Sequence, residues 1–441
     1  MENMTIKRKN VFQNKNFSLL FGGVLVSNIA HILFNFAISL FILRVANSAY
    51  GKETAAMIQA LYLALSGIVL VILMPFGGVL ADKLNKVRIM YITDFIRGFT
   101  IIFVGLFLVF VDDVVLRIVV LFVMNLVLSV NSSIFQPASS SLLRFIVSDE
   151  ELQPAAAYLQ GSSSFQAIIG LVLGGVLYAT VGIVWIFFIN GVGYVISAIS
   201  EMFIRYNHHE HASSDISMRI VLRDIREGLS YIFHAKPIFV TLMMALGLNF
   251  FLSPIFSNAL PYFIEFDLGA STNYLFSSFL KPENWYSIIS VSLSISAIIM
   301  SLILSRQKTK DSYGKDLKRA ILIFVLLMCA LATVMVGFYL GFVSISAVLV
   351  GLTLIMFLLG FANTAFNIPV NLIFQRKVDK KQLGKVSSVS GVLSQALIPI
   401  ASLIAGVLIS QISINAIYLF ALVGMVLVTI FYVTNKQASE I

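Results

Sequence analysis

The chain has 441 residues, of which 59% are hydrophobic and only 12% charged, and its mean hydropathy is +0.95. Soluble domains carry about 25% charged residues, so this composition excludes a set of soluble domains. Apolar stretches of about 20 residues, the length that a helix needs to cross a bilayer, recur along the whole sequence. We therefore predict an all-α membrane protein.

The apolar stretches predict twelve transmembrane helices, and from the basic N-terminus we expect no removable signal peptide. The first six cover residues 17–43, 54–80, 89–111, 115–137, 155–180 and 183–204. The last six cover residues 237–264, 285–305, 317–340, 342–366, 386–410 and 412–434. We expect two pseudo-symmetric six-helix halves, 1–204 and 237–441, joined by a linker at 205–236. The short loops at Thr180–Ile183 and Gly341 must be tight turns.

The cations favour one predicted side of these helices. If the N-terminus is cytoplasmic, 25 of the 30 Lys and Arg residues are cytoplasmic, four lie on the other side, and Arg97 lies within a span. This bias follows the positive-inside rule and predicts that both termini are cytoplasmic. It accounts for the net charge of +9 without a nucleic-acid partner, and it adds attraction to anionic membrane lipids.

The longest polar connection, residues 205–236, contains apolar residues at helical spacing over 220–233. We expect an amphipathic helix on the cytoplasmic face. His208, His209 and His211 precede it, but their spacing fits no closed metal site, so a solvated linker is expected. The single cysteine, Cys329, excludes a disulfide framework or a cysteine metal site. We expect no metal and no cofactor.

An internal repeat supports the division into two halves. Residues 133–161 resemble residues 364–391, with Phe135 matching Phe366 and Gln136 matching Asn367. Each segment ends a span with a proline, crosses a charged loop and starts the next span, at spans 4–5 and 10–11. A repeated six-helix unit is typical of secondary transporters.

Ionisable side chains inside spans are costly and are therefore functional candidates. Asp94 and Arg97 lie three residues apart on one face of the third span and can pair. The pair either stabilises the cytoplasmic end of that helix or acts in transport, with Asp94 taking a proton or Arg97 holding a polar substrate group. His31 either carries a proton near neutral pH or fills an interhelical hydrogen bond. Glu201 is expected to reach the membrane surface and have no special role.

Neutral polar residues form stripes at helical spacing on the first and tenth spans. Such stripes face a cavity or a partner helix rather than lipid. The candidate substrate-cavity residues are Asn28, Asn35, Gln136, Gln166, Asn363 and Asn367. In the fifth span, Gly170, Gly174 and Gly175 have the small-residue spacing that permits close helix approach.

The loop between the second and third spans has the sequence GGVLADKLNKVR over residues 77–88. It resembles the Gly-x-Leu-Ala-Asp-Arg-x-Gly-Arg-Lys loop of major facilitator superfamily transporters, with Lys83 in place of Arg and Asn85 in place of the second Gly. Asn tolerates left-handed backbone geometry, so we expect Asn85 to replace that Gly with little change.

The same loop supplies a gating hypothesis. Its candidate residues are Asp82, Lys83, Lys86 and Arg88. Asp82 is expected to contact the positive N-terminal end of the eleventh span, near Lys385 and Ser387, when the cytoplasmic side is closed. Such a contact would favour the outward-facing state.

Several longer segments are similar to the macrolide-efflux branch of bacterial major facilitator exporters. They are NKNFSLLFGGVLVS, DEELQPAAAYLQ, IREGLSYIFHAKPIF and FQRKVDKKQLGKVSSVSG. The resemblance implies a bacterial cytoplasmic-membrane protein, a small hydrophobic or amphipathic substrate, and proton-driven alternating access. Siderophore export and lysophospholipid transport, known in relatives, are alternatives.

The sequence contains no Gly-x-x-x-x-Gly-Lys-Ser/Thr loop, metal cluster or nucleophile motif, so we expect a transporter rather than an enzyme. Its expected partners are the substrate, protons and membrane lipids, and we expect a monomer.

Overall fold

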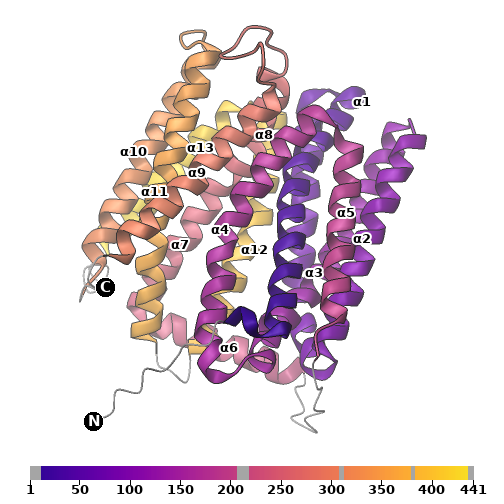
Figure 1. Cartoon of the computed structure of the whole chain (residues 1–441). Coiled ribbons are helices and arrows are strands. Elements are labelled where there is room, and N and C mark those ends of the chain that lie inside the picture. The colour runs from indigo at the N-terminus through magenta and orange to yellow at the C-terminus, as the bar shows by residue number, and fades with distance from the viewer. Residues whose placement is uncertain (1–10, 206–217, 307–311, 379–382, 436–441) are drawn as a thin grey trace.

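The computed structural model describes residues 11–205, 218–306, 312–378 and 383–435, and these are helical without a strand (Figure 1). The first group of elements is η1 (Val11–Gln13), α1 (Lys15–Lys83), α2 (Lys86–Phe110), α3 (Val114–Ile146), α4 (Asp149–Thr180), α5 (Ile183–Met202) and α6 (Met218–His234). The second is α7 (Lys236–Pro254), η2 (Ile255–Ala259), α8 (Leu260–Tyr262), η3 (Phe263–Leu268), α9 (Pro282–Ser305), α10 (Gly314–Tyr339), α11 (Ile345–Lys377), α12 (Leu383–Gln411) and α13 (Asn415–Thr434).

α1 contains two membrane helices. Gly51 has φ 79° and ψ 165° and breaks the helix, a backbone conformation that glycine adopts without a steric penalty. The chain turns back there, since Gln59 Nε2 donates to the Ser39 carbonyl at 3.1 Å. Eleven helices of the described part are long and apolar enough to cross a membrane, and the division of α1 brings them to the twelve predicted spans. Gly182 and Gly341, with φ 79° and 80°, form the predicted tight turns.

The repeated prolines do not end their spans, so that prediction was wrong. Pro137 lies inside α3 and Pro369 inside α11, and both helices continue to the end of the bundle. Membrane helices tolerate proline where nearby side chains satisfy the freed carbonyl groups.

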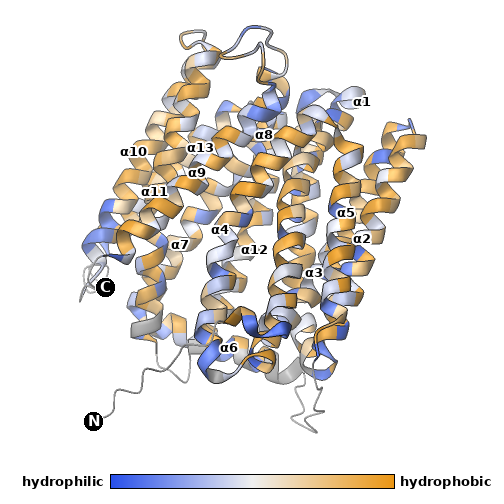
Figure 2. Ribbon diagram, viewed as in Figure 1, coloured by the Kyte–Doolittle hydropathy of each residue, from blue (hydrophilic) through white to orange (hydrophobic). Residues whose placement is uncertain are grey.

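The helices pack as two groups, α1–α5 and α7–α13, which contact each other chiefly through α1 with α12 and α4 with α9 (Figure 1). Since α1 supplies two spans, each group has six, as predicted for the fold. The domain boundaries at residues 204 and 236 remain a prediction. Hydrophobic residues predominate along the helices (Figure 2), and Phe103 and Leu326 are each 68% exposed, as expected of a face in contact with lipid.

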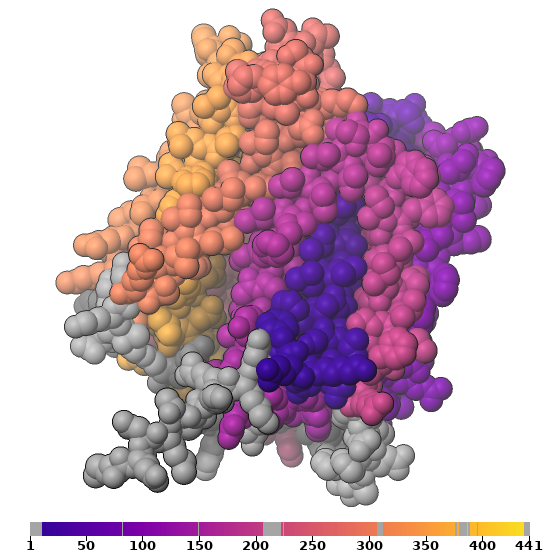
Figure 3. All heavy atoms as spheres, viewed as in Figure 1, coloured from indigo at the N-terminus to yellow at the C-terminus, as the bar shows by residue number. Residues whose placement is uncertain are grey.

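The predicted amphipathic helix is α6, which lies at one end of the bundle (Figure 1). Its apolar residues Ile225, Leu229 and Ile232 pack with Val386 and Val389 of α12. We call this end the α6 side and the opposite end, where α1 turns, the Gly51 side. In Figure 3 the molecular face is hollowed between α4 and the helices of the second group, toward the α6 side.

Candidate functional site

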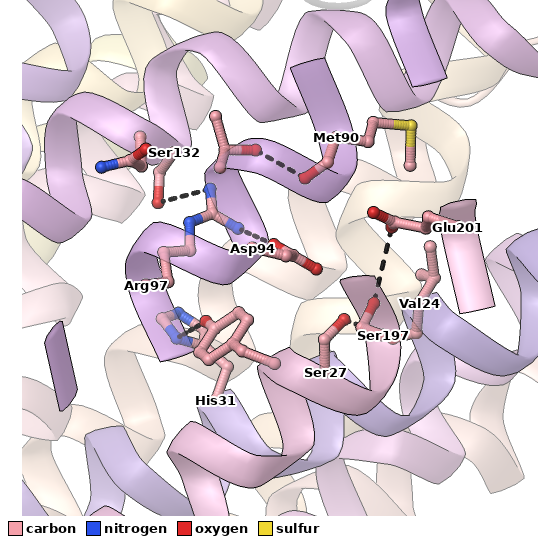
Figure 4. Close-up of polar contacts among 12 residues, drawn as sticks. Val24, Ser27, His31, Met90, Asp94, Arg97, Ser132, Ser197 and Glu201 are labelled. Atoms are coloured by element: carbon pink, nitrogen blue, oxygen red, sulfur yellow. Dashed lines mark hydrogen bonds and ion pairs between the residues drawn. The ribbon is translucent and has the colours of Figure 1, made fainter. Parts of the chain in front are cut away.

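A buried ionic cluster lies inside the first group of helices (Figure 4). Asp94 and Arg97 come from α2 and Glu201 from the last turn of α5, and their exposed fractions are 0%, 5% and 0%. The two helices approach closely through glycines, because a Cβ on Gly98 would lie 2.8 Å from the Gly191 carbonyl oxygen. The fold therefore places three ionisable side chains where little water can reach them.

Arg97 is held from several helices at once. Its guanidinium donates to Asp94 Oδ1 at 3.0 Å, so the expected contact on α2 is formed, and to Ser132 Oγ of α3 at 3.2 Å. It also lies over two aromatic rings, 4.6 Å from the Phe135 centroid and 5.5 Å from that of Tyr194. Arg97 thus connects α2 to both α3 and α5.

Glu201 was expected to reach the membrane surface, and this was wrong. The end of α5 is fixed against α1, where Ser200 donates to the Leu19 carbonyl at 2.9 Å, and Glu201 faces α2 instead. Sequence spacing contained a signal for this. Asn190, Tyr194, Ser197 and Glu201 recur at intervals of four, three and four, which places them on one helix face, and all four are buried.

Both carboxylates of the cluster have an oxygen without a hydrogen-bond partner among the described residues, Oδ2 of Asp94 and Oε2 of Glu201. The other Glu201 oxygen accepts from Ser197 at a long 3.5 Å. Buried polar atoms are usually hydrogen-bonded, so two free carboxylate oxygens in one cluster are unusual.

His31 lies beside this cluster rather than in it. Its Nδ1 is 3.0 Å from the Tyr194 hydroxyl, and its Nε2 is 2.9 Å from Asn35 Nδ2. A neutral imidazole, with one donor and one acceptor, satisfies both contacts. The side-chain amide of Asn35 is therefore hydrogen-bonded to His31.

The gating loop is described in part. The side chains of Asp82, Lys385 and Ser387 lie outside the described residues, so the proposed contact to the eleventh span remains a prediction. Lys83 and Arg88 are exposed.

Lys86 is buried, with its Nζ donating to the Ala81 carbonyl at 2.5 Å and lying 5.5 Å from the Phe145 ring centroid of α3. Asn85 does not adopt the left-handed backbone geometry that asparagine tolerates. Its φ is −63° and ψ 113°, because Asn85 caps α2 by accepting from the Arg88 backbone N–H at 3.1 Å.

A cavity of about 530 Å³ lies between α1, α3 and α4, and we call it the α3–α4 cavity. Asn28, Phe135 and Gln136 are among its lining residues. Gln166 lies behind it, accepting from Asn28 Nδ2 at 3.1 Å and donating to Ser162.

A second cavity of about 530 Å³, the α7–α9 cavity, is lined chiefly by the other group, with Leu171 of α4 on one side. Its polar lining residues include Asn249, Ser290 and Asn363, and Tyr286 and Phe256 provide aromatic surface. Asn367 donates to the backbone carbonyl and side-chain oxygen of Asn363 at 3.0 and 2.7 Å. The residues that line the two cavities are uncharged.

The two groups are joined on the Gly51 side by Arg44. It donates to Glu265 of η3 and, at 3.2 Å, to Glu283 of α9. Sequence reasoning placed Arg44 only as one of four cations on that side and missed its role. Acidic residues flanking the loop after span seven were the available signal.

Close packing of α4 on α9 adjoins this ion pair. Asn284 Nδ2 donates to the Gly175 carbonyl at 3.3 Å, and Lys281 and Ser287 donate to the carbonyls of Ala179 and Leu171. A Cβ on Gly175 would lie 2.5 Å from Ser287 Cβ. Gly170 and Gly174 pack against Ile32 and Phe36 of α1, so the small-residue spacing permits close approach as predicted.

No group of three or more His, Cys, Asp or Glu residues within the described segments could hold a metal ion. His208, His209 and His211 lie outside those segments. Cys329 is exposed on α10.

Comparison with known proteins adds the family. A model described as Major Facilitator Superfamily matches residues 20–401. The chain is 24% identical to Macrolide efflux protein A of Streptococcus pyogenes over 422 residues, 94% of each chain. It is 26% identical to YkuC of Bacillus subtilis (strain 168), an uncharacterized MFS-type transporter, over 234 residues that cover 52% of each chain.

Solved transporters share the fold. A POT family transporter in complex with 5-aminolevulinic acid superposes with a TM-score of 0.73 at 14% identity, covering 98% of both chains. A bacterial homologue of the iron transporter ferroportin in an inward-facing state has a TM-score of 0.70 at 16% identity, covering 96% of this chain and 98% of that one.

Proposed function

Because this chain belongs to the Major Facilitator Superfamily, we propose that it is a proton-coupled exporter of hydrophobic or amphipathic compounds such as macrolides. The observation that carries the proposal is similarity to Macrolide efflux protein A along 94% of each chain. The two cavities support it. They are large, uncharged and lined by amides, hydroxyls and aromatic rings, which suits a bulky substrate with scattered hydrogen-bonding groups.

Alternating access is supported by the asymmetry of the bundle. Ion pairs and close helix packing join the groups on the Gly51 side, whereas the molecular face is hollowed toward the α6 side. With the α6 side in the cytoplasm, as the cation distribution predicts, this is an inward-facing state that would take up substrate from within the bacterium. Transport would then require separation of the groups on the Gly51 side.

Proton coupling is assigned to Asp94 and Arg97. Their buried pair leaves one Asp94 oxygen free, whereas both nitrogens of His31 already have partners. One proton moved across 100 mV supplies about 2.3 kcal/mol, so one or two protons are enough to drive export against a concentration gradient. His31 is assigned a supporting hydrogen bond.

The test is accumulation of a radiolabelled macrolide in a pump-deficient bacterium that expresses the chain, with dyes and lysophospholipids measured in parallel. We expect cells that express the chain to accumulate less macrolide than cells that lack it. A protonophore, or the variant Asp94→Asn at equal expression, should return accumulation to the level of cells that lack the chain. Unchanged macrolide accumulation together with altered lysophospholipid transport would overturn the substrate assignment. Lower accumulation that a protonophore does not restore would overturn the coupling.

A further inference from the structure

We propose that Asp94 and Glu201 together bind one proton in this state of the protein, with Glu201 as a proton-binding residue in its own right. The inference rests on the proposed proton coupling and extends it to a residue that sequence reasoning had placed at the membrane surface.

The first argument is the charge count. The buried cluster contains two carboxylates, both 0% exposed, and one guanidinium. Arg97 neutralises one carboxylate and already donates to Asp94 Oδ1. If both acids were ionised, one negative charge would be left without compensation at a site shielded from water, which is strongly unfavourable. One bound proton removes that charge.

The second argument is the pair of free oxygens. Asp94 Oδ2 and Glu201 Oε2 have no hydrogen-bond partner among the described residues, and the two carboxylates face one space between α2 and α5 (Figure 4). The Ser197 hydroxyl lies near both acids but has only one proton to donate. A proton on one carboxyl group supplies the missing donor.

The other ionisable groups around the pair are already engaged. Arg97 of α2 faces the pair. His31 of α1 and Tyr194 of α5 lie beyond Arg97 and are hydrogen-bonded to each other. The side chains of α3 that lie nearby are Ser132 and Phe135, and neither titrates. A hard metal cation is disfavoured, because it prefers about six oxygen ligands and Arg97 already brings a positive charge to the site.

The cluster has a physical connection to the α3–α4 cavity. The Arg97 guanidinium lies 4.6 Å from the centroid of the Phe135 ring, and Phe135 lines that cavity. Loss of the proton would leave Arg97 facing two carboxylates instead of one, which draws it toward them and away from α3. Proton release would thereby change the wall of a cavity that we propose for substrate.

The experiment is infrared spectroscopy of the full-length protein in lipid bilayers at neutral pH, without substrate. The carbonyl stretch of a protonated carboxyl group is separate from that of a carboxylate and shifts in D₂O. We expect this band to be lost in Glu201→Gln and equally in Asp94→Asn, because the single remaining carboxylate is then neutralised by Arg97. Glu150→Gln, an exposed glutamate in the first turn of α4, is the matched control and should retain the band.

The proposal would be overturned if the difference spectrum between the unaltered protein and either folded variant lacked this band. If Glu201→Gln does not fold, Asp94→Asn alone gives the test, because Arg97 then neutralises the single remaining carboxylate and the band must be lost. The measurement needs no substrate and no gradient. If the protein does not export macrolides, the proposal of a shared proton on Asp94 and Glu201 is unaffected. If the infrared band is absent, the substrate assignment is unaffected.

Discussion

Arg44 forms a two-point ion pair with Glu265, from Nε to Oε1 at 2.7 Å and from a terminal nitrogen to Oε2 at 3.0 Å. The same terminal nitrogen is 3.2 Å from Oε1 of Glu283. Arg44 belongs to the first group of helices and both acids to the second. One arginine thus joins the two groups at the Gly51 side, where they must separate if the protein alternates its access.

Replacing Arg44 with Gln should therefore open the Gly51 side more often. The Arg44 side chain is 52% exposed, so we expect a loss of only about 1 kcal/mol, which is about a fivefold change in a two-state population. The measurement is the labelling rate of Ser290→Cys, in the α7–α9 cavity, in a Cys329→Ser background. A membrane-impermeant maleimide added from the Gly51 side should react about fivefold faster.

Arg117→Gln is the matched control for Arg44→Gln. Arg117 pairs with Asp112, 3.0 Å away, within the first group, so its loss should leave the labelling rate unchanged. Equal rates for both arginine variants would show that the Arg44 contacts do not close this side.

Gly175→Ala should destabilise the contact between α4 and α9. The new methyl group would lie 2.5 Å from Ser287 Cβ and 3.0 Å from the Glu283 carbonyl oxygen, so the helices must move apart. Overpacking of this kind costs about 1–3 kcal/mol. We expect a lower midpoint of thermal unfolding in detergent and slower macrolide export.

Gly161→Ala on the same helix provides the comparison for Gly175→Ala. No atom outside its own helix lies within 4 Å of the added methyl group, and alanine favours helix more than glycine does. Its midpoint should be unchanged or slightly higher. A Gly175 variant as stable as the Gly161 variant would contradict the close packing.

Asp94→Asn should abolish pH-driven macrolide uptake into inverted membrane vesicles while leaving expression intact. The substitution removes the carboxylate that pairs with Arg97, which then faces Glu201 alone and has no proton to exchange. Asp112→Asn, an acid of the same helix group that is fully exposed, should transport normally. Proton-driven uptake by the Asp94 variant would exclude Asp94 as the carrier.

His31→Gln should leave the pH dependence of transport unchanged and lower stability. Both ring nitrogens have hydrogen-bond partners, and leaving the buried Tyr194 hydroxyl without its partner costs about 1–3 kcal/mol. The pH profile and the unfolding midpoint are measured on one preparation. A shifted profile at unchanged stability would instead make His31 a proton carrier.

Ser294→Phe should block the α7–α9 cavity, since Ser294 is one of its lining residues. A bulky macrolide should be exported more slowly, because the added ring occupies part of the 530 Å³. Ser301→Phe, two turns along the same helix and exposed, should export at the original rate. Identical rates for the two variants would place substrate elsewhere.

The sequence by itself determined the membrane fold. A stretch of about 20 apolar residues must form a helix in a bilayer, because the backbone has no other way to satisfy its hydrogen bonds. It also determined contacts within one helix, such as Asp94 with Arg97, since residues three apart share a face. The spacing of the small residues around Gly175 likewise predicted close helix approach from the local sequence alone.

Only the tertiary structure decided which side chains meet between helices. Glu201 is buried because α2 stands against the last turn of α5, and Arg44 is paired because two acids from distant segments meet it at the Gly51 side. Helical periodicity fixes the direction of a side chain but not the neighbour it faces. Asn85 shows the same limit at short range, because its role as a cap depends on where α2 begins.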